Sequence, residues 1–216
     1  MINILFEDNH ILVIEKPINV LVQADKSNDE DLLTILKRYL KEKYNKPGNV
    51  YLGLVHRLDR VVDGVMVLAK TSKAAARLSK QVTNKQFQKI YYAVVEGDLK
   101  TKGRLENYLV KDEKTNKSFV REKGKLAILD YQVLNKRKNY NLVKINLKTG
   151  RHHQIRVQFS YIGAPLFGDA KYNKNYKKGE QIALFAKELT FFHPVTREAL
   201  TFSLELPKRF PFTIFS

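Results

Sequence analysis

The sequence predicts an α+β fold built around a largely antiparallel or mixed sheet flanked by helices. Strand-like runs recur along the 216 residues and outnumber the helical segments. Strands and helices do not alternate regularly, which argues against a doubly wound fold. A hydrophobic fraction of 44%, with 12 Phe and 11 Tyr, excludes a disordered chain. The length suits one large domain or two small ones, and we expect a single domain over residues 1–216.

The first third of the chain combines short strands with one helix. Residues 11–23 resemble two short strands interrupted at Pro17, because proline disrupts a sheet interior. Residues 27–44 are expected to form a helix with acidic residues in its first turn. Its apolar stripe contains Leu32, Ile35, Leu36, Tyr39 and Leu40. The apolar run 64–70 lies between turn signals and predicts an interior strand.

The next elements are a helix and two strands. Residues 72–82 are expected to form a helix capped by Ser72. Residues 89–97 have the composition of a strand. In residues 141–150, apolar and polar side chains alternate, which predicts a half-buried strand.

The last part of the chain contains one short helix followed by strands. In residues 151–163, Ile155, Phe159 and Ile162 follow helical spacing, and Gly163 stands where a C-terminal cap is expected. Two strand-like runs follow, at residues 181–192 and 198–206.

The charge of the chain indicates a polyanionic partner. Lys and Arg number 39 against 22 Asp and Glu, which gives a net charge of +17. Neutralising phosphates with such residues releases condensed counterions, so RNA or DNA is favoured over an anionic membrane surface. The basic residues are dispersed among aromatic ones, as in residues 135–144 and 171–179, which suits a folded binding face. Any single run is better explained as a solubilising surface, whereas the total charge favours nucleic acid.

Several kinds of site are absent from the sequence. There is no cysteine, so disulfides, thiolate nucleophiles and cysteine-based zinc sites are excluded. The histidines lack metal-ligand spacing, and on a helix His152 and His153 would point about 100° apart. No glycine-rich phosphate loop or nucleophile elbow is found. The N-terminus has acidic residues by position 7 and no sustained apolar stretch, so we expect neither a signal peptide nor a membrane span, and the cytoplasm is the default compartment.

Asp59 lies between Arg57 and Arg60, directly ahead of the predicted strand 64–70. A neighbouring guanidinium favours the charged form of a carboxylate, which can then act as a nucleophile or a base. Taken alone, this segment favours a structural ion pair over catalysis. Asp63 is interpreted as a turn residue before Gly64.

Four segments together resemble the motifs of the RluA-type pseudouridine synthases. Residues 56–70, HRLDRVVDGVMVLAK, are similar to the family's H-R-L-D motif and the apolar strand that follows it. Residues 15–22 (EKPINVLV) resemble D-K-P-x-G-x-x-V, and residues 89–97 (KIYYAVVEG) resemble K-x-Y-x-A-x-V-x-G. Residues 147–172 resemble T-G-R-x-H-Q-I-R-V-H followed by G-x-P-I-x-G-D-x-x-Y. Four motifs in the family's order are not credible as chance.

The resemblance implies the pseudouridine synthase fold, with an active-site cleft along the sheet, and a set of site residues. Asp59 would be the catalytic nucleophile, and Arg156 would pair with it. Tyr91 would stack on the target uracil and is the candidate for moving the C5 proton. The residues implied to support the site or contact RNA are His56, Arg57, Arg60, Arg151, His153 and Gln154. The reaction needs no cofactor and no metal, and a monomer is the default state.

The implied reaction isomerises a uridine within ribosomal or transfer RNA. The N1–C1′ bond breaks, the base rotates, and a C5–C1′ bond forms. A buried base must first be flipped from its stack, which calls for an aromatic platform and a basic rim. Whether the aspartate attacks C1′ or C6, or removes a ribose proton, is left open by the sequence.

The chain departs from the family's pattern in three places. Val62 and Asp63 replace the family's Thr-Ser, Asn19 stands where glycine is common, and Gln158 replaces a histidine. Asparagine tolerates positive φ, so we expect the turn at Asn19 to survive. The motifs begin near residue 11, so we expect no separate N-terminal RNA-binding domain.

Two other functions are compatible with parts of the sequence. One is a catalytically idle RNA-binding or ribosome-assembly protein of the same fold, although such a protein would have no reason to retain Asp59, Tyr91 and Arg156. The other is a basic structural protein of a ribonucleoprotein, which explains the charge but not the four motifs.

Overall fold

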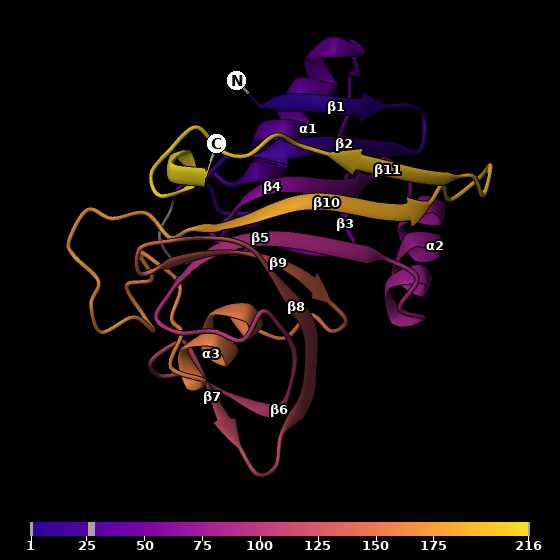
Figure 1. The fold of residues 1–216 in the computed structure, drawn as a ribbon. Helices are drawn as coiled ribbons and strands as arrows, with labels where there is room; N and C mark the ends of the chain where they lie inside the picture. The colour runs from indigo at the N-terminus through magenta and orange to yellow at the C-terminus, as the bar shows by residue number, and fades with distance from the viewer. Residues whose placement is uncertain (1, 26–28, 216) are drawn as a thin grey trace. The chain divides into compact units, whose positions relative to one another are not determined.

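The chain forms two compact units, which a computed structural model describes over residues 2–25 and 29–215. Unit 1 consists of Met1–Phe87 and Glu188–Leu204, and unit 2 of Gln88–Lys187 and Glu205–Ser216. Figure 1 labels the helices and strands of both units. Strand β10 (Leu184–Phe192) contributes residues 184–187 to unit 2 and residues 188–192 to unit 1.

The sheet strands of unit 1 are antiparallel wherever their register is defined. The elements are β1 (Asn3–Glu7), β2 (Ile11–Lys16), β3 (Gly53–Leu54), β4 (Asp63–Ala69) and β11 (Ala199–Ser203). Strand β2 pairs with β1 on one side and β4 on the other, β3 pairs with β4, and β11 pairs with β10. All seven residues of β4 are buried, as the apolar run 64–70 predicted. Its side chains share a core with β2, α2 and β10, in which Val13, Val67 and Phe191 are almost fully buried.

Of the two helices of unit 1, α1 begins later than predicted, whereas α2 begins at the predicted residue but has a different cap. Helix α1 covers Leu32–Lys43 and is capped by Asp31, whose side chain accepts a hydrogen bond from the Thr34 amide. The acidic residues therefore precede the helix, and residues 27 and 28 lie outside the described residues. Helix α2 covers Ser72–Thr83, and its cap is Thr71 rather than Ser72. The predicted apolar stripe of α1 is confirmed, because every fourth residue from Leu32 to Leu40 is buried.

The predicted second strand after Pro17 is wrong. The described residues between Pro17 and Asp25 form turns and irregular structure. Asn19 has a φ of 63°, so an asparagine does serve where the family commonly has glycine.

Unit 2 is built on long antiparallel strands. They are β5 (Gln88–Glu96), β6 (Lys102–Asp112), β7 (Lys117–Arg121), β8 (Lys125–Arg137) and β9 (Tyr140–Leu147). Their order is β5-β9-β8-β6-β7. Residues 89–97 and 141–150 were predicted as strands and are confirmed, whereas β6, β7 and β8 were not predicted.

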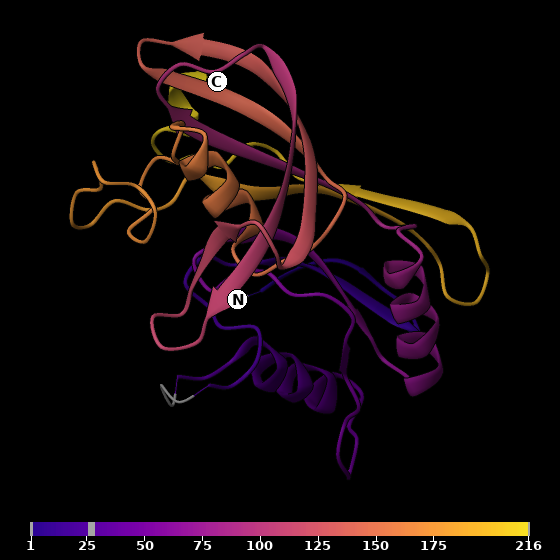
Figure 2. The ribbon, with the colours of Figure 1, turned by 90° about the horizontal axis from the view of Figure 1, so that it is seen from below.

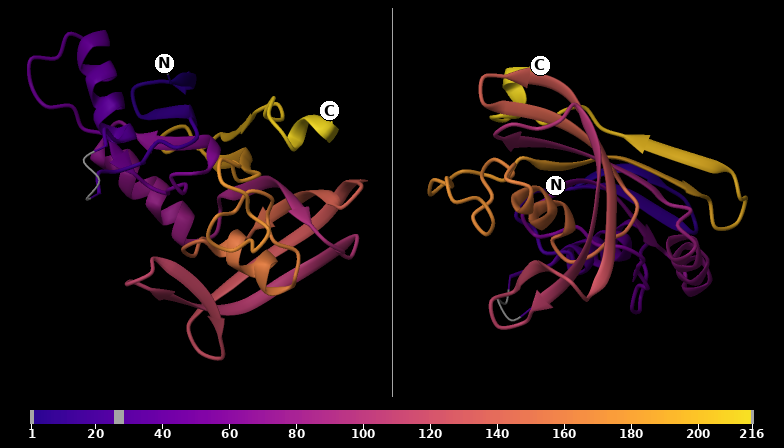
Figure 3. Two further views of the ribbon diagram at one scale, coloured as in Figure 1. Left: turned by 90° about the vertical axis from the view of Figure 1, so that its left-hand side faces the viewer. Right: turned by 60° about the horizontal axis from the view of Figure 1, so that its bottom comes forward.

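Helix α3 (Gln154–Tyr161) packs against the curved β6–β8 pair of unit 2, as Figures 2 and 3 show. Val157 of the helix shares a small core with Leu109 and Ala127. Gly163 follows the helix with a φ of 78°, which confirms the predicted cap. A short 3-10 helix, η1 (Phe212–Phe215), lies near the C-terminus. The fold class is thus α+β with an antiparallel-rich sheet, as predicted.

Candidate active site

Asp59 lies in a tight turn between the short strand β3 and the buried strand β4. Its carbonyl accepts a hydrogen bond from the Val62 amide at 3.0 Å, which closes a four-residue turn. The side chain of Asp59 is half-buried, and the strand that follows it is fully buried. A rigid strand therefore fixes one end of the turn that carries the carboxylate.

Lys16 forms hydrogen bonds to the main chain of this turn, and the sequence did not identify it as a site residue. Its side chain is fully buried. The ammonium group donates to three backbone carbonyl oxygens: those of Pro17 at 2.9 Å, Arg60 at 3.1 Å and Val62 at 2.8 Å. The lysine of the E-K-P segment was visible in the sequence, but nothing there placed its partners 44 and 46 residues away.

The other predicted residues of this segment have different environments. The His56 Nε2 atom accepts a hydrogen bond from the Val67 amide at 3.1 Å, which attaches the loop to β4. Arg57 is exposed. Arg60 is also exposed and forms an ion pair with Asp29 at 2.7 Å. Arg57 is therefore accessible to an anionic ligand, and the exposed Arg60–Asp29 pair can be exchanged for one.

Asp63 is not the turn residue that the sequence suggested. It is the first residue of β4, and its exposed fraction is 8%. Its carboxylate acts electrostatically on Lys16. The turn lies earlier, at Arg60 and Val61, so Asp63 lies in the buried strand that follows the turn.

Tyr91 and Arg156 both belong to unit 2. Tyr91 is in β5, opposite Ile145 of β9, and is 8% exposed. Arg156 is in α3 and is 5% exposed. Its Nε and Nη2 atoms donate to the two carboxylate oxygens of Asp169 at 2.8 and 2.7 Å. This bidentate pair was not predicted, and the pairing of Arg156 with Asp59 stays a prediction.

His152 and His153 are stacked rather than divergent. Their ring centroids lie 3.7 Å apart, because both residues precede α3 and His153 adopts a left-handed backbone with φ 53°. The expectation that they point about 100° apart assumed a helix at this position and was wrong. Ser118 contacts the His152 ring, and the Tyr172 hydroxyl lies 2.8 Å from His153 Nδ1.

His153 is a neutral side chain at physiological pH. Burial lowers its pKa to about 2, and the nearby charge of Arg156 acts in the same direction. Its ring therefore offers hydrogen-bonding nitrogens but no positive charge.

Gln154 and Arg151 hold the loop ahead of α3. The Gln154 Oε1 atom accepts from the Thr149 hydroxyl at 2.7 Å and from the Arg151 amide at 3.0 Å, and its Nε2 donates to the Ile128 carbonyl. Arg151 is exposed, with its Nε donating to the Leu126 carbonyl at 2.9 Å. Their predicted contact with RNA stays a prediction, with Arg151 the more accessible of the two.

Comparisons with known proteins identify the family of the chain. The family model described as RNA pseudouridylate synthase matches residues 10–161. An uncharacterized RNA pseudouridine synthase of Aquifex aeolicus is 34% identical over 97% of this chain and 71% of its own length. The ribosomal large subunit pseudouridine synthase D of Zymomonas mobilis is 32% identical over 96% of this chain and 70% of its own.

The chain belongs to the RNA pseudouridine synthase family. It is an isomerase that acts on RNA, of the RluA type that the four motifs indicated. A solved human structure, RNA pseudouridylate synthase domain containing 4, shares the fold with a TM-score of 0.82 at 24% identity, over 99% of this chain and 92% of that one.

One exposed face of this synthase combines aromatic and basic side chains in unit 2. On the β6–β7 pair, Tyr108 lies opposite Arg121 and Val110 lies opposite Phe119, so the four side chains share one face. Tyr108 and Val110 are 46% and 43% exposed, and the Arg121 guanidinium lies 5.2 Å from the Phe119 ring centre. We call these four residues the β6–β7 face. Exposed aromatics beside arginine are typical of surfaces that stack RNA bases.

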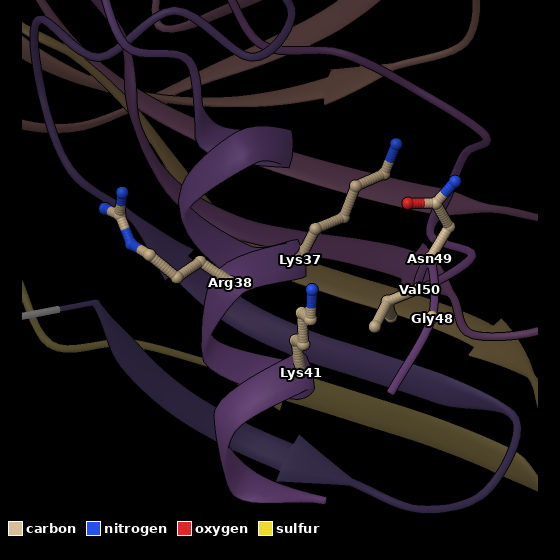
Figure 4. Close-up of a pocket in the computed structure, with 6 residues that line it drawn as sticks. All are labelled: Lys37, Arg38, Lys41, Gly48, Asn49 and Val50. Atoms are coloured by element: carbon tan, nitrogen blue, oxygen red, sulfur yellow. The ribbon is translucent and has the colours of Figure 1, made fainter. Parts of the chain in front are cut away.

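A basic cavity of about 430 Å³ lies in unit 1 of the synthase. It is lined by Lys37, Arg38, Lys41, Gly48, Asn49 and Val50. Figure 4 shows Lys37 and Lys41 directed toward the loop that holds Asn49 and Val50. Arg38 is engaged by Glu30 at 2.7 Å. Two lysines and an arginine therefore give this open concavity a basic lining.

Among the described residues, no group of three or more His, Cys, Asp or Glu side chains could hold a metal ion. Over the same part of the chain, no helix has the length and hydropathy needed to cross a membrane.

Proposed function

We propose that this synthase converts uridines of large-subunit ribosomal RNA to pseudouridine, with Asp59 as the catalytic carboxylate. The observation that carries the proposal is the similarity, at about a third identity over almost the whole chain, to proteins named ribosomal large subunit pseudouridine synthase D. The position of Asp59 in a turn fixed by β4 supports its role, because a reacting group must be held in place.

Three residues have separate roles in the proposed reaction. Asp59 acts on the flipped nucleotide, so that the N1–C1′ bond breaks and the C5–C1′ bond forms. Tyr91 stacks on the uracil, and Arg156 balances the negative charge of Asp59. The C5 hydrogen leaves as a proton and N1 gains one, so the reaction neither consumes nor releases any other atom.

The synthase binds its RNA as a monomer through its own basic surfaces. The β6–β7 face supplies stacking, and the basic cavity of unit 1 supplies cations for phosphates. Exposed Arg57 and Arg151 add charge close in sequence to Asp59 and Arg156 respectively.

Tritium release tests this proposal. Uridine labelled at C5 is incorporated into unmodified large-subunit ribosomal RNA and, separately, into transfer RNA. Each RNA is incubated with wild type, Asp59→Asn and Glu198→Gln. Glu198 is an exposed carboxylate of the same unit, so its variant controls for the loss of one negative charge.

Wild type and Glu198→Gln are expected to release tritium from ribosomal RNA, and Asp59→Asn is expected to release none. Release from transfer RNA alone would overturn the proposed substrate. Release by Asp59→Asn at the wild-type rate would overturn its catalytic role. RNA binding by wild type without release from either RNA would favour the idle RNA-binding protein instead.

A further inference from the structure

Helix α1 ends in a motif that turns the following loop back beside the helix. Asn45 has a φ of 51°, and its amide donates to the Glu42 carbonyl at 3.2 Å. The Lys46 amide donates to the Lys41 carbonyl at 3.0 Å. Two such bonds around a left-handed residue form a Schellman motif, a common end of helices. The basic cavity of unit 1 lies between the helix and this loop, as Figure 4 shows.

Three exposed side chains follow the side of α1 that borders this cavity. Lys37, Lys41 and Tyr44 are spaced by four and three residues, so they lie on one face of the helix. We call these three residues the α1 face. Arg38 is engaged by Glu30 at 2.7 Å, so it is not counted with them.

The segment that carries the α1 face is strongly basic. Residues 32–51 contain five Lys and Arg against one Glu. The helix dipole favours cations in the last turn, which gives Lys41 and Lys43 a role in the stability of α1. The dipole effect falls off within one turn, so it explains neither Lys37 nor Lys46. Both of these lysines are exposed to an anionic ligand.

The Tyr44 ring is held in place among ammonium groups. Its hydroxyl donates to Glu7 Oε1 at 2.6 Å, and the residue is 45% exposed. The ammonium groups of Lys70, Lys43 and Lys46 lie 4.7, 5.6 and 5.9 Å from the ring centre. Three positive charges therefore surround the ring, against the one negative charge of Glu7. A fixed, exposed aromatic ring beside excess positive charge suits the stacking of a nucleic-acid base.

The α1 face lies near the end of β4 that is opposite to the catalytic turn. Lys70, which contacts the Tyr44 ring, directly follows β4, whereas Asp59 precedes this strand. A strand of seven residues is about 20 Å long. A nucleotide stacked on Tyr44 is therefore a different one from the nucleotide on which Asp59 acts.

We propose that the α1 face binds a second segment of the RNA substrate, with Lys37 and Lys41 against phosphates and Tyr44 stacked on an unpaired base. The proposal rests on the RNA substrate proposed above and adds a contact remote from the target uridine. Lysines alone would suit any polyanion, including an RNA duplex or an anionic membrane. The exposed ring favours RNA with unpaired bases, because only an unstacked base offers its face to an aromatic side chain.

The salt dependence of RNA binding tests the two lysines. The unmodified large-subunit ribosomal RNA transcript is titrated at several salt concentrations with wild type and with the double variant Lys37→Gln/Lys41→Gln. Each lost contact to a single-strand phosphate reduces the slope of log Kd against log salt by about 0.7, so the double variant is expected to lose about 1.4. Lys73→Gln/Lys80→Gln is the matched control, since both lysines are exposed on α2 of the same unit. It should keep the wild-type slope.

Two variants of Tyr44 test base stacking. Tyr44→Phe keeps the ring and loses the hydroxyl bond to Glu7, whereas Tyr44→Leu loses both. On the ribosomal transcript, Tyr44→Leu is expected to bind about fivefold or more weakly, and Tyr44→Phe like wild type. On a fully paired RNA duplex, both variants should bind like wild type. Thermal unfolding checks that each variant is folded.

Several outcomes would overturn the proposal. An equal loss of slope in the Lys73 and Lys80 control would show an effect of net charge alone. Wild-type affinity of Tyr44→Leu for the transcript, or an equal loss on the duplex, would refute stacking. If Tyr44→Leu does not fold, the exposed lysine pair decides. Wild-type RNA binding by Lys37→Gln/Lys41→Gln, with weaker binding to phosphatidylserine vesicles, would identify a membrane contact instead.

The proposed function fails by a different measurement. Tritium release by wild type is recorded on the same transcript. If no tritium is released but the α1-face variants still lose RNA affinity as expected, the proposed substrate is wrong and the α1 face stands as an RNA-binding surface.

Discussion

The buried pair of Arg156 and Asp169 permits a quantitative prediction for Asp169→Asn. Asp169 has no solvent exposure, and its two carboxylate oxygens each accept one hydrogen bond from the guanidinium group. The Asp169 Oδ1 atom also accepts from the amides of Lys171 and Tyr172. The carboxylate thus connects α3 to the segment after it.

The substitution keeps the shape of the side chain and removes its charge. Because both oxygens face guanidinium N–H groups, either orientation of the new amide places one donor against another. Removing one partner of a buried ion pair costs about 3–5 kcal/mol. For a chain of this size, each kcal/mol corresponds to about 2–4 °C in Tm, so we expect Tm to fall by roughly 6–20 °C.

Thermal and urea unfolding, followed by circular dichroism, measure this loss. Asp130→Asn is the matched control in unit 2, because that carboxylate is 40% exposed and lies 3.6 Å from Lys148 and 3.9 Å from Arg104. Its loss should cost no more than about 1 kcal/mol. If Asp169→Asn were as stable as Asp130→Asn, the view that this pair holds α3 in place would be wrong.

Two further predictions concern acid stability and RNA binding. Burial acts to raise the pKa of Glu7, but hydrogen bonds from two lysines and two tyrosines outweigh it and lower that pKa to about 2. The stability that Glu7 contributes is therefore present above pH 4.5 and lost as pH falls toward 2, so urea unfolding of wild type and Glu7→Gln should converge over that window. On the β6–β7 face, replacing Tyr108 and Phe119 by serine should raise KM for RNA about tenfold or more without lowering kcat, since stacking contributes about 1–3 kcal/mol per base. Tyr161→Ser, which removes an aromatic side chain that is 63% exposed elsewhere in unit 2, should leave KM unchanged, and an equal rise in both proteins would contradict a specific face.

The sequence predicted elements whose pattern is local. The run 64–70 is uniformly apolar and bounded by turn signals, so its burial as β4 followed from composition. The apolar side chains of α1 repeat with the period of a helix, so their burial could also be predicted from the sequence. Asn19 was expected to accept a left-handed backbone, and it does so.

Features that depend on distant partners could not be predicted. Strand β6 is largely exposed along its length and rich in charged residues, so it carries no strong apolar signal, and its pairing with β7 and β8 is what makes it a strand. Asp169 and Lys16 are ordinary charged residues in the sequence. Only the fold places the Arg156 guanidinium group beside Asp169 and three carbonyl groups around Lys16. Asp63 was misjudged for the same reason, since its burial comes from its position at the start of β4.

Because His153 is neutral, it supplies no positive charge to the segment at the start of α3. A histidine beside an arginine in an RNA-modifying enzyme suggests a second cation for phosphate. Here burial and the charge of Arg156 keep the ring uncharged, and Arg156 itself donates to Asp169 and is largely buried. Exposed Arg151 remains as the cation of this segment that phosphate can reach. The four-residue run from Arg151 to Gln154 therefore combines one accessible charge with side chains that shape the loop.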